Sequence, residues 1–297
     1  MSEDEVKALV PRPSGELQRV GSGPGRLLSR VVSDALGFAR SAALQGARFR
    51  LGDFEFREPD YRQIEIWAEC LGVSADEVLR CLMASSVEVD NDAYRFRLAD
   101  GSIEALVFDA SHFDWPGGQL NLSSVPRLVT LWCNRTQLTE LNLWGLPELQ
   151  ALQCVRNQLT ELELSGVAGL EELWCYDNQL TWLDLSGVPE LQVLGCGDNR
   201  LSDLDLSSVP GLNWLNCDGN KLTQLDLSNV PWLSDLTCGR NRLTELDLSV
   251  VPELTRLVCW GNKITQLDVR ANLKLKTLSC DPWVEVRKLP DQVFSDA

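Results

Sequence analysis

A 21-residue unit repeats in phase along most of this chain, and it constrains the fold more than any other feature. Its most regular copy is Leu212–Trp232, with the sequence LNWLNCDGNKLTQLDLSNVPW. A unit of this length cannot bury its apolar face alone, so successive copies must stack into a solenoid. The cysteine at position 6 gives the register of the copies, which contain Cys133, Cys154, Cys175, Cys196, Cys217, Cys238, Cys259 and Cys280.

Apolar residues fill seven positions of the unit, and their spacing predicts how each coil runs. Positions 4 and 6 alternate with positions 3, 5 and 7, which is the period of a β-strand. The alternation at Leu225-Asp226-Leu227 indicates a second extended segment on the opposite wall. Asn at position 9, such as Asn220, predicts an internal ladder that bonds its own turn and the neighbouring one. The seven apolar positions of one coil are Leu212, Leu215, Cys217, Leu222, Leu225, Leu227 and Val230.

The core pattern L-x-x-L-x-C-x-x-N-x-L resembles the leucine-rich repeat superfamily, with Cys in place of the third Leu. The 21-residue period and the L-T-x-L-D-L-S half resemble the short bacterial class called IRREKO repeats. The resemblance implies an α/β repeat fold, a right-handed solenoid with a parallel, concave β-sheet. It also implies that the solenoid works as a protein-binding surface, but it names no partner.

Four segments are expected along the chain. Residues 1–28 are rich in Pro, Gly, Ser and charge, which is typical of a disordered tail. Residues 29–102 form an α+β N-terminal cap, with helices over 33–46, 61–71 and beyond 74, and with hairpins over 49–56 and 87–98. Residues 103–281 form the solenoid, in which Ile103, Leu106 and Phe108 begin a divergent first coil with a four-residue insertion. Residues 282–297 form a short C-terminal cap over the open end.

The net charge of −16 restricts the classes of partner. Nucleic acids and anionic membranes attract basic surfaces, so neither is expected to bind this chain. The N-terminus lacks the basic and apolar regions of a signal peptide. Buried free thiols also favour a reducing compartment. We therefore expect a cytoplasmic, monomeric protein. Export by a route that needs no cleaved signal is the alternative.

Catalytic patterns are scarce in the sequence: only carboxylates could supply such chemistry, and nothing in their spacing selects a pair. The one histidine, His112, has no serine or cysteine nucleophile pattern near it, and no nucleotide-binding or zinc-protease motif occurs. We therefore expect no enzymatic activity and no cofactor or metal. The cysteine column is expected to pack as small apolar residues, with redox chemistry and soft-metal binding as alternatives. The acidic column at position 15 is expected to cap the following turn, with Ca²⁺ as the alternative; it contains Glu163, Asp184, Asp205, Asp226, Asp247 and Asp268.

Function is expected on the concave sheet, where the repeat leaves positions 2, 3, 5, 7 and 8 free to vary. Trp, Tyr and Arg dominate binding hot spots, and these residue types recur at the variable positions. We expect a protein partner to contact Trp132, Arg135, Arg156, Glu172, Trp174, Tyr176, Trp214 and Trp260. Shielding of the sheet from water is the alternative role for the aromatic residues. A structural or self-associating protein and a bacterial effector acting on a host protein are the alternative functions.

Overall fold

The computed structural model describes residues 48–51, 54–71, 75, 78, 96–99, 102–109, 118–122 and 124–295. The expected disordered tail, the helix over 33–46, the helix beyond residue 74 and His112 therefore lie outside the described residues, apart from residues 75 and 78, which are helical. Among the described helices, none is long and apolar enough to cross a membrane.

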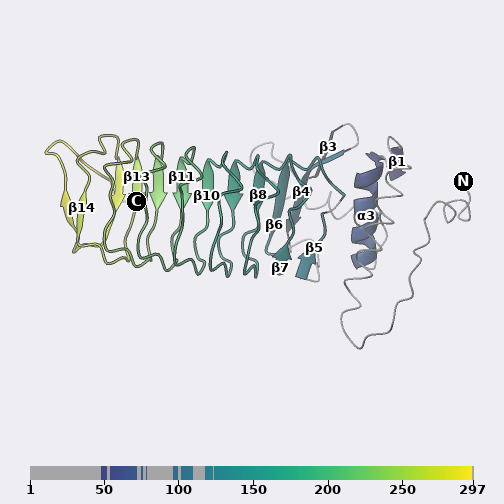
Figure 1. Cartoon of the computed structure of the whole chain (residues 1–297), viewed down its shortest axis with the longest axis horizontal. Coiled ribbons are helices and arrows are strands. Elements are labelled where there is room, and N and C mark those ends of the chain that lie inside the picture. The colour runs from purple at the N-terminus through teal and green to yellow at the C-terminus, as the bar shows by residue number, and fades with distance from the viewer. Residues whose placement is uncertain are drawn as a thin grey trace, which may run out of the picture. The chain divides into compact units, whose positions relative to one another are not determined.

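A ten-stranded sheet forms one wall of the solenoid (Figure 1). Each coil from residue 102 onwards contributes one strand, which pairs in parallel with the strand 21 residues further on, or 25 at the first step. The antiparallel strand β3 (Phe96–Ala99) lies at one edge and β15 at the other. The strands of the coils are β4 (Ser102–Asp109), β6 (Thr130–Asn134), β8 (Ala151–Gln153), β9 (Glu172–Trp174), β10 (Val193–Gly195), β11 (Trp214–Asn216), β12 (Asp235–Thr237), β13 (Arg256–Val258) and β15 (Thr277–Ser279).

The apolar positions of the unit form the interior, as the sequence predicts. In the coil of Leu212, all seven of these side chains are at most 7% exposed. Cys217 is fully buried, and the column from Cys133 to Cys259 is buried with free thiols. The divergent first coil follows the same register, because Leu106 pairs with Leu131 and Phe108 pairs with Cys133. In the first coil Ile103 and Leu106 are fully buried, so the expected core is confirmed at these two positions as well as in the regular coils.

The asparagine ladder at position 9 connects each coil to the preceding one. Asn220 Nδ2 donates to Cys217 O in its own coil at 3.1 Å and to Cys196 O in the preceding coil at 3.0 Å. Its Oδ1 accepts a hydrogen bond from Leu201 N at 2.9 Å. The same contacts recur from Asn157 to Asn262. A buried amide thus satisfies backbone groups that the turn cannot pair itself.

The far wall, opposite the sheet, forms a ladder only near its ends. There β5 (Gly118–Leu120) pairs with β7 (Leu138–Leu141), and β14 (Gln266–Asp268) pairs with β16 (Glu285–Arg287). Between them, the structure assigns no strand to the far wall. The coils there keep one backbone bond each, such as Lys221 N to Leu201 O at 2.8 Å. The extended segment expected at Leu225–Leu227 is therefore stacked but not strand-paired.

The helix α3 (Glu58–Leu71) packs against the first coil and begins where Pro59 is tolerated, in the first turn. Ile64 and Trp67 are fully buried in the same core as the leucines. The Trp67 indole N–H donates to Asn121 O at 2.9 Å, and Asp60 Oδ1 accepts from Ile103 N at 2.8 Å. These contacts agree with an N-terminal cap, although the boundaries expected for the cap stay a prediction.

The sequence predicts two hairpins near α3, and the structure describes only the first of them in full. The strands β1 (Arg48–Leu51) and β2 (Phe54–Arg57) pair antiparallel across residues 52–53, which confirms the first hairpin. The second was expected to pair residues 87–89 with residues 94–98 and stays a prediction; of this range the structure describes β3, which pairs with β4. Residues 87–95 lie outside the described residues.

The last coil ends in contacts that replace those of a further coil. Asp281 Oδ2 accepts from Gly261 N at 2.7 Å, where earlier coils use a backbone carbonyl. Ser295 then lies along the free edge of β15. Its backbone N donates to Lys276 O at 2.9 Å, and its backbone O accepts from Leu278 N at 3.2 Å. The tail therefore covers the edge strand, as expected of a C-terminal cap.

Candidate interaction surface

The outward side chains of the ten-stranded sheet form a continuous surface, which we call the sheet face. Parallel pairing in register aligns equivalent positions, so position 3 of each coil lies beside position 3 of the next. The row at position 5 runs Trp132, Gln153, Trp174, Gly195 and Asn216. The sheet face thus combines large aromatic residues with positions that carry no side chain.

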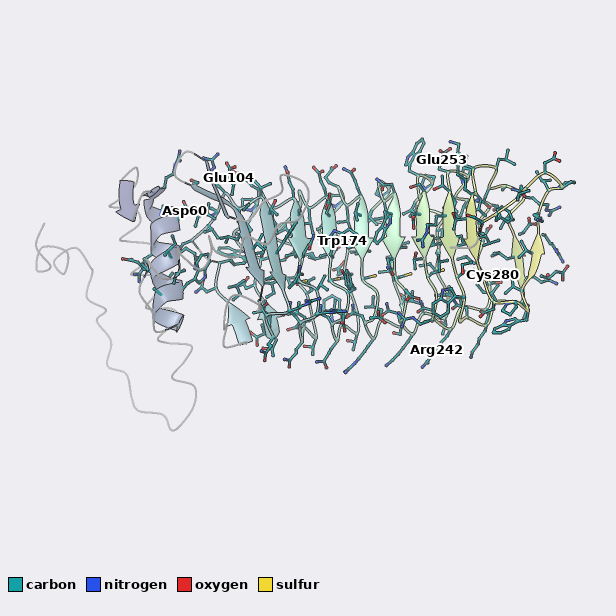
Figure 2. The ribbon with its side chains drawn as sticks, turned by 180° about the vertical axis from the view of Figure 1, so that it is seen from behind. Asp60, Glu104, Trp174, Arg242, Glu253 and Cys280 are labelled. Carbon is teal, nitrogen blue, oxygen red and sulfur yellow. The ribbon has the colours of Figure 1, made fainter. Side chains whose placement is uncertain are left out.

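Three of the expected contact residues form an aromatic cluster, which we define as Trp174, Tyr176 and Trp214. The ring centroids of Trp174 and Trp214 are 4.8 Å apart with an angle of 47° between the planes. Tyr176 meets Trp174 edge-on at 6.3 Å and is 38% exposed, whereas the two tryptophans are half-buried. Figure 2 shows Trp174 in the middle of the row of strands.

Gly195 makes this arrangement possible. A Cβ at this residue would lie 2.7 Å from Cε3 of Trp174, which is closer than side chains approach. The indole of Trp174 therefore lies over the backbone of β10 and reaches Trp214 on the strand beyond. Sequence reasoning missed this role, although a glycine between two aromatic strands signals a close approach to the backbone.

Position 8, in the turn after each strand, holds a residue in the left-handed conformation. The φ values are 58° at Arg135, 56° at Arg156 and 65° at Gly219. Arg156 Nε donates to Asp177 at 3.0 Å, so charged side chains of neighbouring coils pair along this corner. Non-glycine residues rarely adopt positive φ, so the stacked hydrogen bonds must hold them there.

A second cluster lies at the same corner, around the guanidinium of Arg240. Its Nη2 donates to Asp198 Oδ1 at 3.0 Å and to Asp218 Oδ2 at 2.5 Å, and Cζ lies 5.9 Å from the ring centroid of Trp260. The hydrogen bond to Asp218 is the main reason that the pKa of Arg240 is raised. Glycine at position 219 leaves room, because a Cβ there would lie 2.3 Å from Asp198 Oδ1.

The remaining expected contact residues do not join the aromatic cluster. Trp132 is half-buried on β6, separated from Trp174 by the strand β8. Arg135 is exposed at the corner, and Trp260 belongs to the Arg240 cluster. Glu172 is exposed on β9, two residues before Trp174. The expected contact residues therefore form no single patch: the sheet face contains the aromatic cluster and, separately, the cluster around Arg240.

The most exposed tryptophans lie away from the sheet face, and sequence reasoning did not single them out. Trp144 is 82% exposed and Trp232 is 65% exposed, and both occupy turns that lead back to the sheet. Trp182 is 48% exposed on the far wall, and Trp283 is 62% exposed after the last strand of the sheet. They are scattered singly, which is common on protein surfaces.

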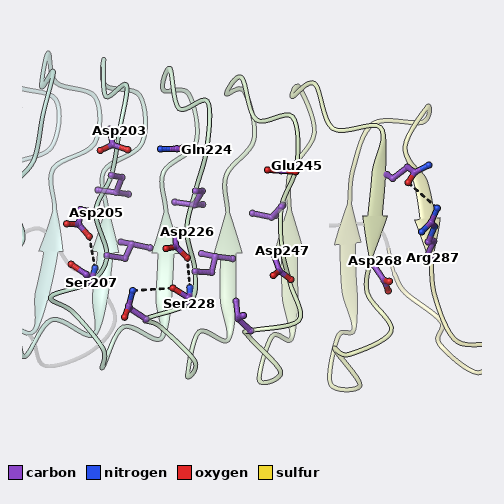
Figure 3. Close-up of a pocket in the computed structure, with 18 residues that line it drawn as sticks. Asp203, Asp205, Ser207, Gln224, Asp226, Ser228, Glu245, Asp247, Asp268 and Arg287 are labelled. Carbon is purple, nitrogen blue, oxygen red and sulfur yellow. Dashed lines mark hydrogen bonds between the residues drawn. The ribbon is translucent and has the colours of Figure 1, made fainter.

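A groove of about 790 Å³ crosses the far wall rather than the sheet face (Figure 3). Its floor includes Leu225 and Leu227. The charged residues of its rim are acidic except for Arg287 at one end, and neutral polar side chains lie between them. The acidic rim residues are Asp203, Asp205, Asp226, Glu245, Asp247 and Asp268. The position-15 column of the sequence contributes four of these six residues, whereas Asp203 and Glu245 at position 13 were not anticipated.

The position-15 carboxylates cap the following turn. Asp226 Oδ1 accepts from Ser228 N at 2.9 Å, and the same bond recurs from Glu163 to Asp268. These backbone hydrogen bonds lower the pKa of Asp205 and Asp226, and Arg270 lowers that of Asp268 to about 2. The expected capping role is confirmed. In the described part of the chain, no group of three or more His, Cys, Asp or Glu residues is arranged to hold a metal ion.

The cysteine column offers little nucleophilic chemistry in the folded protein. Burial raises the pKa of the Cys133 and Cys259 thiols to about 12, and it raises the pKa of the thiols between them as well. Because the thiolate is the reactive form, these residues act as apolar packing groups. Cys280 is partly exposed at the end of the column.

Comparison with solved structures identifies proteins built in the same way. The functional domain of InlJ from Listeria monocytogenes, which includes a cysteine ladder, is 32% identical with a TM-score of 0.55. The match covers 57% of this chain and 38% of the InlJ chain, so it spans well under half of that protein. A search with protein-family models and a search of curated proteins find no match.

Two further structures share the fold at lower identity. Internalin C2 from Listeria monocytogenes is 19% identical with a TM-score of 0.53, over 78% of this chain and 93% of that chain. A leucine-rich repeat protein of Leptospira interrogans is 22% identical with a TM-score of 0.51, over 57% and 50% of the two chains. Together with the 21-residue coils and the buried cysteine column, these likenesses show a leucine-rich repeat solenoid with a cysteine ladder.

Proposed function

We propose that this leucine-rich repeat solenoid is a non-enzymatic protein-interaction module that binds its partner on the sheet face. The observation that carries the proposal is the aromatic cluster of Trp174, Tyr176 and Trp214, three ring systems gathered on an outward surface. Folding of the repeat does not need them, because equivalent positions in other coils hold Gln153, Gly195 or Thr237.

The surroundings of the cluster suit a binding surface. Half-buried aromatic side chains contribute large contact areas at little cost in conformational entropy, and they dominate measured hot spots. The ion pairs of Arg156 and Arg240 lie beside the cluster along the corner, where exposed pairs add little stability. Such a polar rim around an aromatic centre is typical of protein interfaces.

The test is a comparison of two double variants in partner capture. Trp132→Ala with Trp174→Ala removes two indoles of the sheet face, and Trp144→Ala with Trp232→Ala removes two from the turns. We expect the first variant to weaken capture of a partner by about 2–4 kcal/mol and the second to leave it unchanged. Equal capture by both variants would remove the sheet face as the site. Thermal melting of each variant checks that both remain folded.

Two alternative functions from the sequence remain distinguishable. A self-associating protein would show a mass that rises with concentration, whereas we propose a monomer. An effector acting on a host protein would capture its partner from host lysate and not from a native lysate. Both comparisons use the same pair of tryptophan variants, so binding through the sheet face is tested in each case.

A further inference from the structure

We propose that the aromatic cluster receives a cationic side chain, an arginine presented by a segment of the partner protein. This inference rests on the proposed function and specifies the chemistry of the partner. The faces of aromatic rings attract cations, and indole attracts them most strongly. The two indoles meet at 47° rather than in a closed stack, and all three rings keep part of their surface exposed to solvent.

The charges around the cluster favour a cation. Three arginines of the sheet face are already paired with aspartates: Arg156 with Asp177, Arg240 with Asp198 and Asp218, and Arg256 with Asp235. Among the described residues Arg135 makes no ion pair, but its coil lies two coils away from that of Trp174. Within the described residues, Glu172 on the strand of Trp174 and Glu171 directly before that strand make no ion pair. The charges beside the aromatic cluster that remain unpaired are therefore negative.

The free carboxylates lie within reach of the rings. Glu172, Val193 and Trp214 occupy one row of the sheet, so Glu172 lies two strand spacings from Trp214, roughly 10 Å. A guanidinium over the indoles is thus in range of the long side chain of Glu172. Aromatic faces and a carboxylate together are the groups that a guanidinium uses best.

The same face already binds one guanidinium within the chain. Arg240 is held between the carboxylates of Asp198 and Asp218 and lies over the ring of Trp260. The aromatic cluster with Glu171 and Glu172 has the same components, and no cation from the described part of the chain lies over its rings. We infer that a partner supplies the arginine there.

The experiment is a titration of the full chain with a capped nonapeptide of Gly and Ser that carries two central arginines. The matched probe has citrulline at both positions, which keeps the shape of the side chain and removes its charge. Binding is followed by NMR through the indole N–H resonances, assigned with single Trp→Phe variants. We expect the Trp174 and Trp214 resonances to shift with the arginine peptide and not with the citrulline peptide.

Two charge variants locate the site. Glu171→Gln with Glu172→Gln should weaken binding of the arginine peptide at least fivefold. Glu161→Gln with Glu245→Gln removes the same charge from the far wall and should change binding less than twofold. Equal shifts with citrulline, shifts confined to other indoles, or equal losses in both charge variants would overturn the inference. If the tryptophan variants abolish partner capture while the arginine peptide fails to bind, the proposed function stands and only this inference is wrong.

Discussion

At the scale of single residues, the asparagine at position 9 connects the coils more directly than any other side chain. Asn220 is 7% exposed and bonds four backbone groups, two of them in the preceding coil. Leucines and cysteines supply apolar contact between coils, but they leave these backbone groups without partners. The ladder therefore determines how the turn of each coil is positioned on its neighbour.

Replacing Asn220 with alanine should destabilise the protein by about 2–4 kcal/mol, because buried backbone donors and acceptors lose their partners. The measurement is the midpoint of urea unfolding followed by circular dichroism. Asn229→Ala is the matched control, since this exposed side chain bonds only Ser228 Oγ at 3.2 Å. A loss below 0.5 kcal/mol for Asn220→Ala would contradict the role of the ladder.

The residue pattern predicted the interior well and the corner poorly. Leucine at positions 1 and 4 must face inward, since a strand alternates and only one side can be buried. The left-handed conformation of position 8 escaped notice because Arg135, Asp177 and Arg240 adopt it without being glycine. Gly219 and Gly261 in the same column were the available signal. The contact between the rings was missed because it depends on Gly195 in the strand between them, and that glycine was the available signal.

At the scale of elements, the turn that follows each strand can be tested at Gly219. Its φ is 65°, and a Cβ would lie 2.3 Å from Asp198 Oδ1. Gly219→Ala should therefore cost about 2 kcal/mol or more, since left-handed strain and displacement of Asp198 add together. Urea unfolding provides the measurement.

Two further variants separate the contributions at Gly219. Gly211→Ala should be close to neutral, because its added Cβ would meet only Leu191 O at 3.8 Å. Adding Asp198→Ala to Gly219→Ala should recover the part of the loss that comes from the clash. A Gly219→Ala variant as stable as the parent would show that the turn is not constrained as described.

The helix α3 carries a carboxyl group whose ionisation opposes its burial. Asp60 is 1% exposed, and this burial raises its pKa to about 6, although hydrogen bonds from Ile103 N and Ser102 and the charge of Arg57 act in the opposite direction. A carboxyl with a raised folded-state pKa binds more protons in the folded protein. Its contribution to stability is therefore full below about pH 4 and is lost as the pH rises through 6.

Asp60→Asn should remove this dependence on pH. The amide oxygen still accepts from Ile103 N, and no charge is buried at neutral pH. We expect the variant to be more stable than the parent at pH 7 by about 1–3 kcal/mol and close to it at pH 4. Urea unfolding at both pH values measures this difference. A constant difference from pH 4 to 7 would show that Asp60 does not titrate in this range.

At the scale of the whole molecule, a parallel solenoid must protect two open ends, and this chain protects them differently. At the first coil, α3 contributes Trp67 to the core and β3 pairs antiparallel with β4. At the last coil, the tail places Ser295 along β15 with two backbone hydrogen bonds. Both devices cover strand edges that would otherwise pair with another chain. The sequence indicated that caps were needed, but Ser295 is not distinguishable from other tail residues by its type.

Removing the hydrogen bond at Ser295 should promote association of the chain through the edge of the sheet. Ser295→Pro deletes the N–H that donates to Lys276 O at 2.9 Å, so the tail detaches and leaves Leu278 N unpaired at the edge of β15. We expect a mass by light scattering that rises with concentration, because the exposed strand templates pairing with a second copy. Ser295→Ala loses only the hydroxyl contacts and should remain monomeric. A Ser295→Pro variant that keeps a constant monomer mass would show that the tail is not what keeps the last coil from pairing.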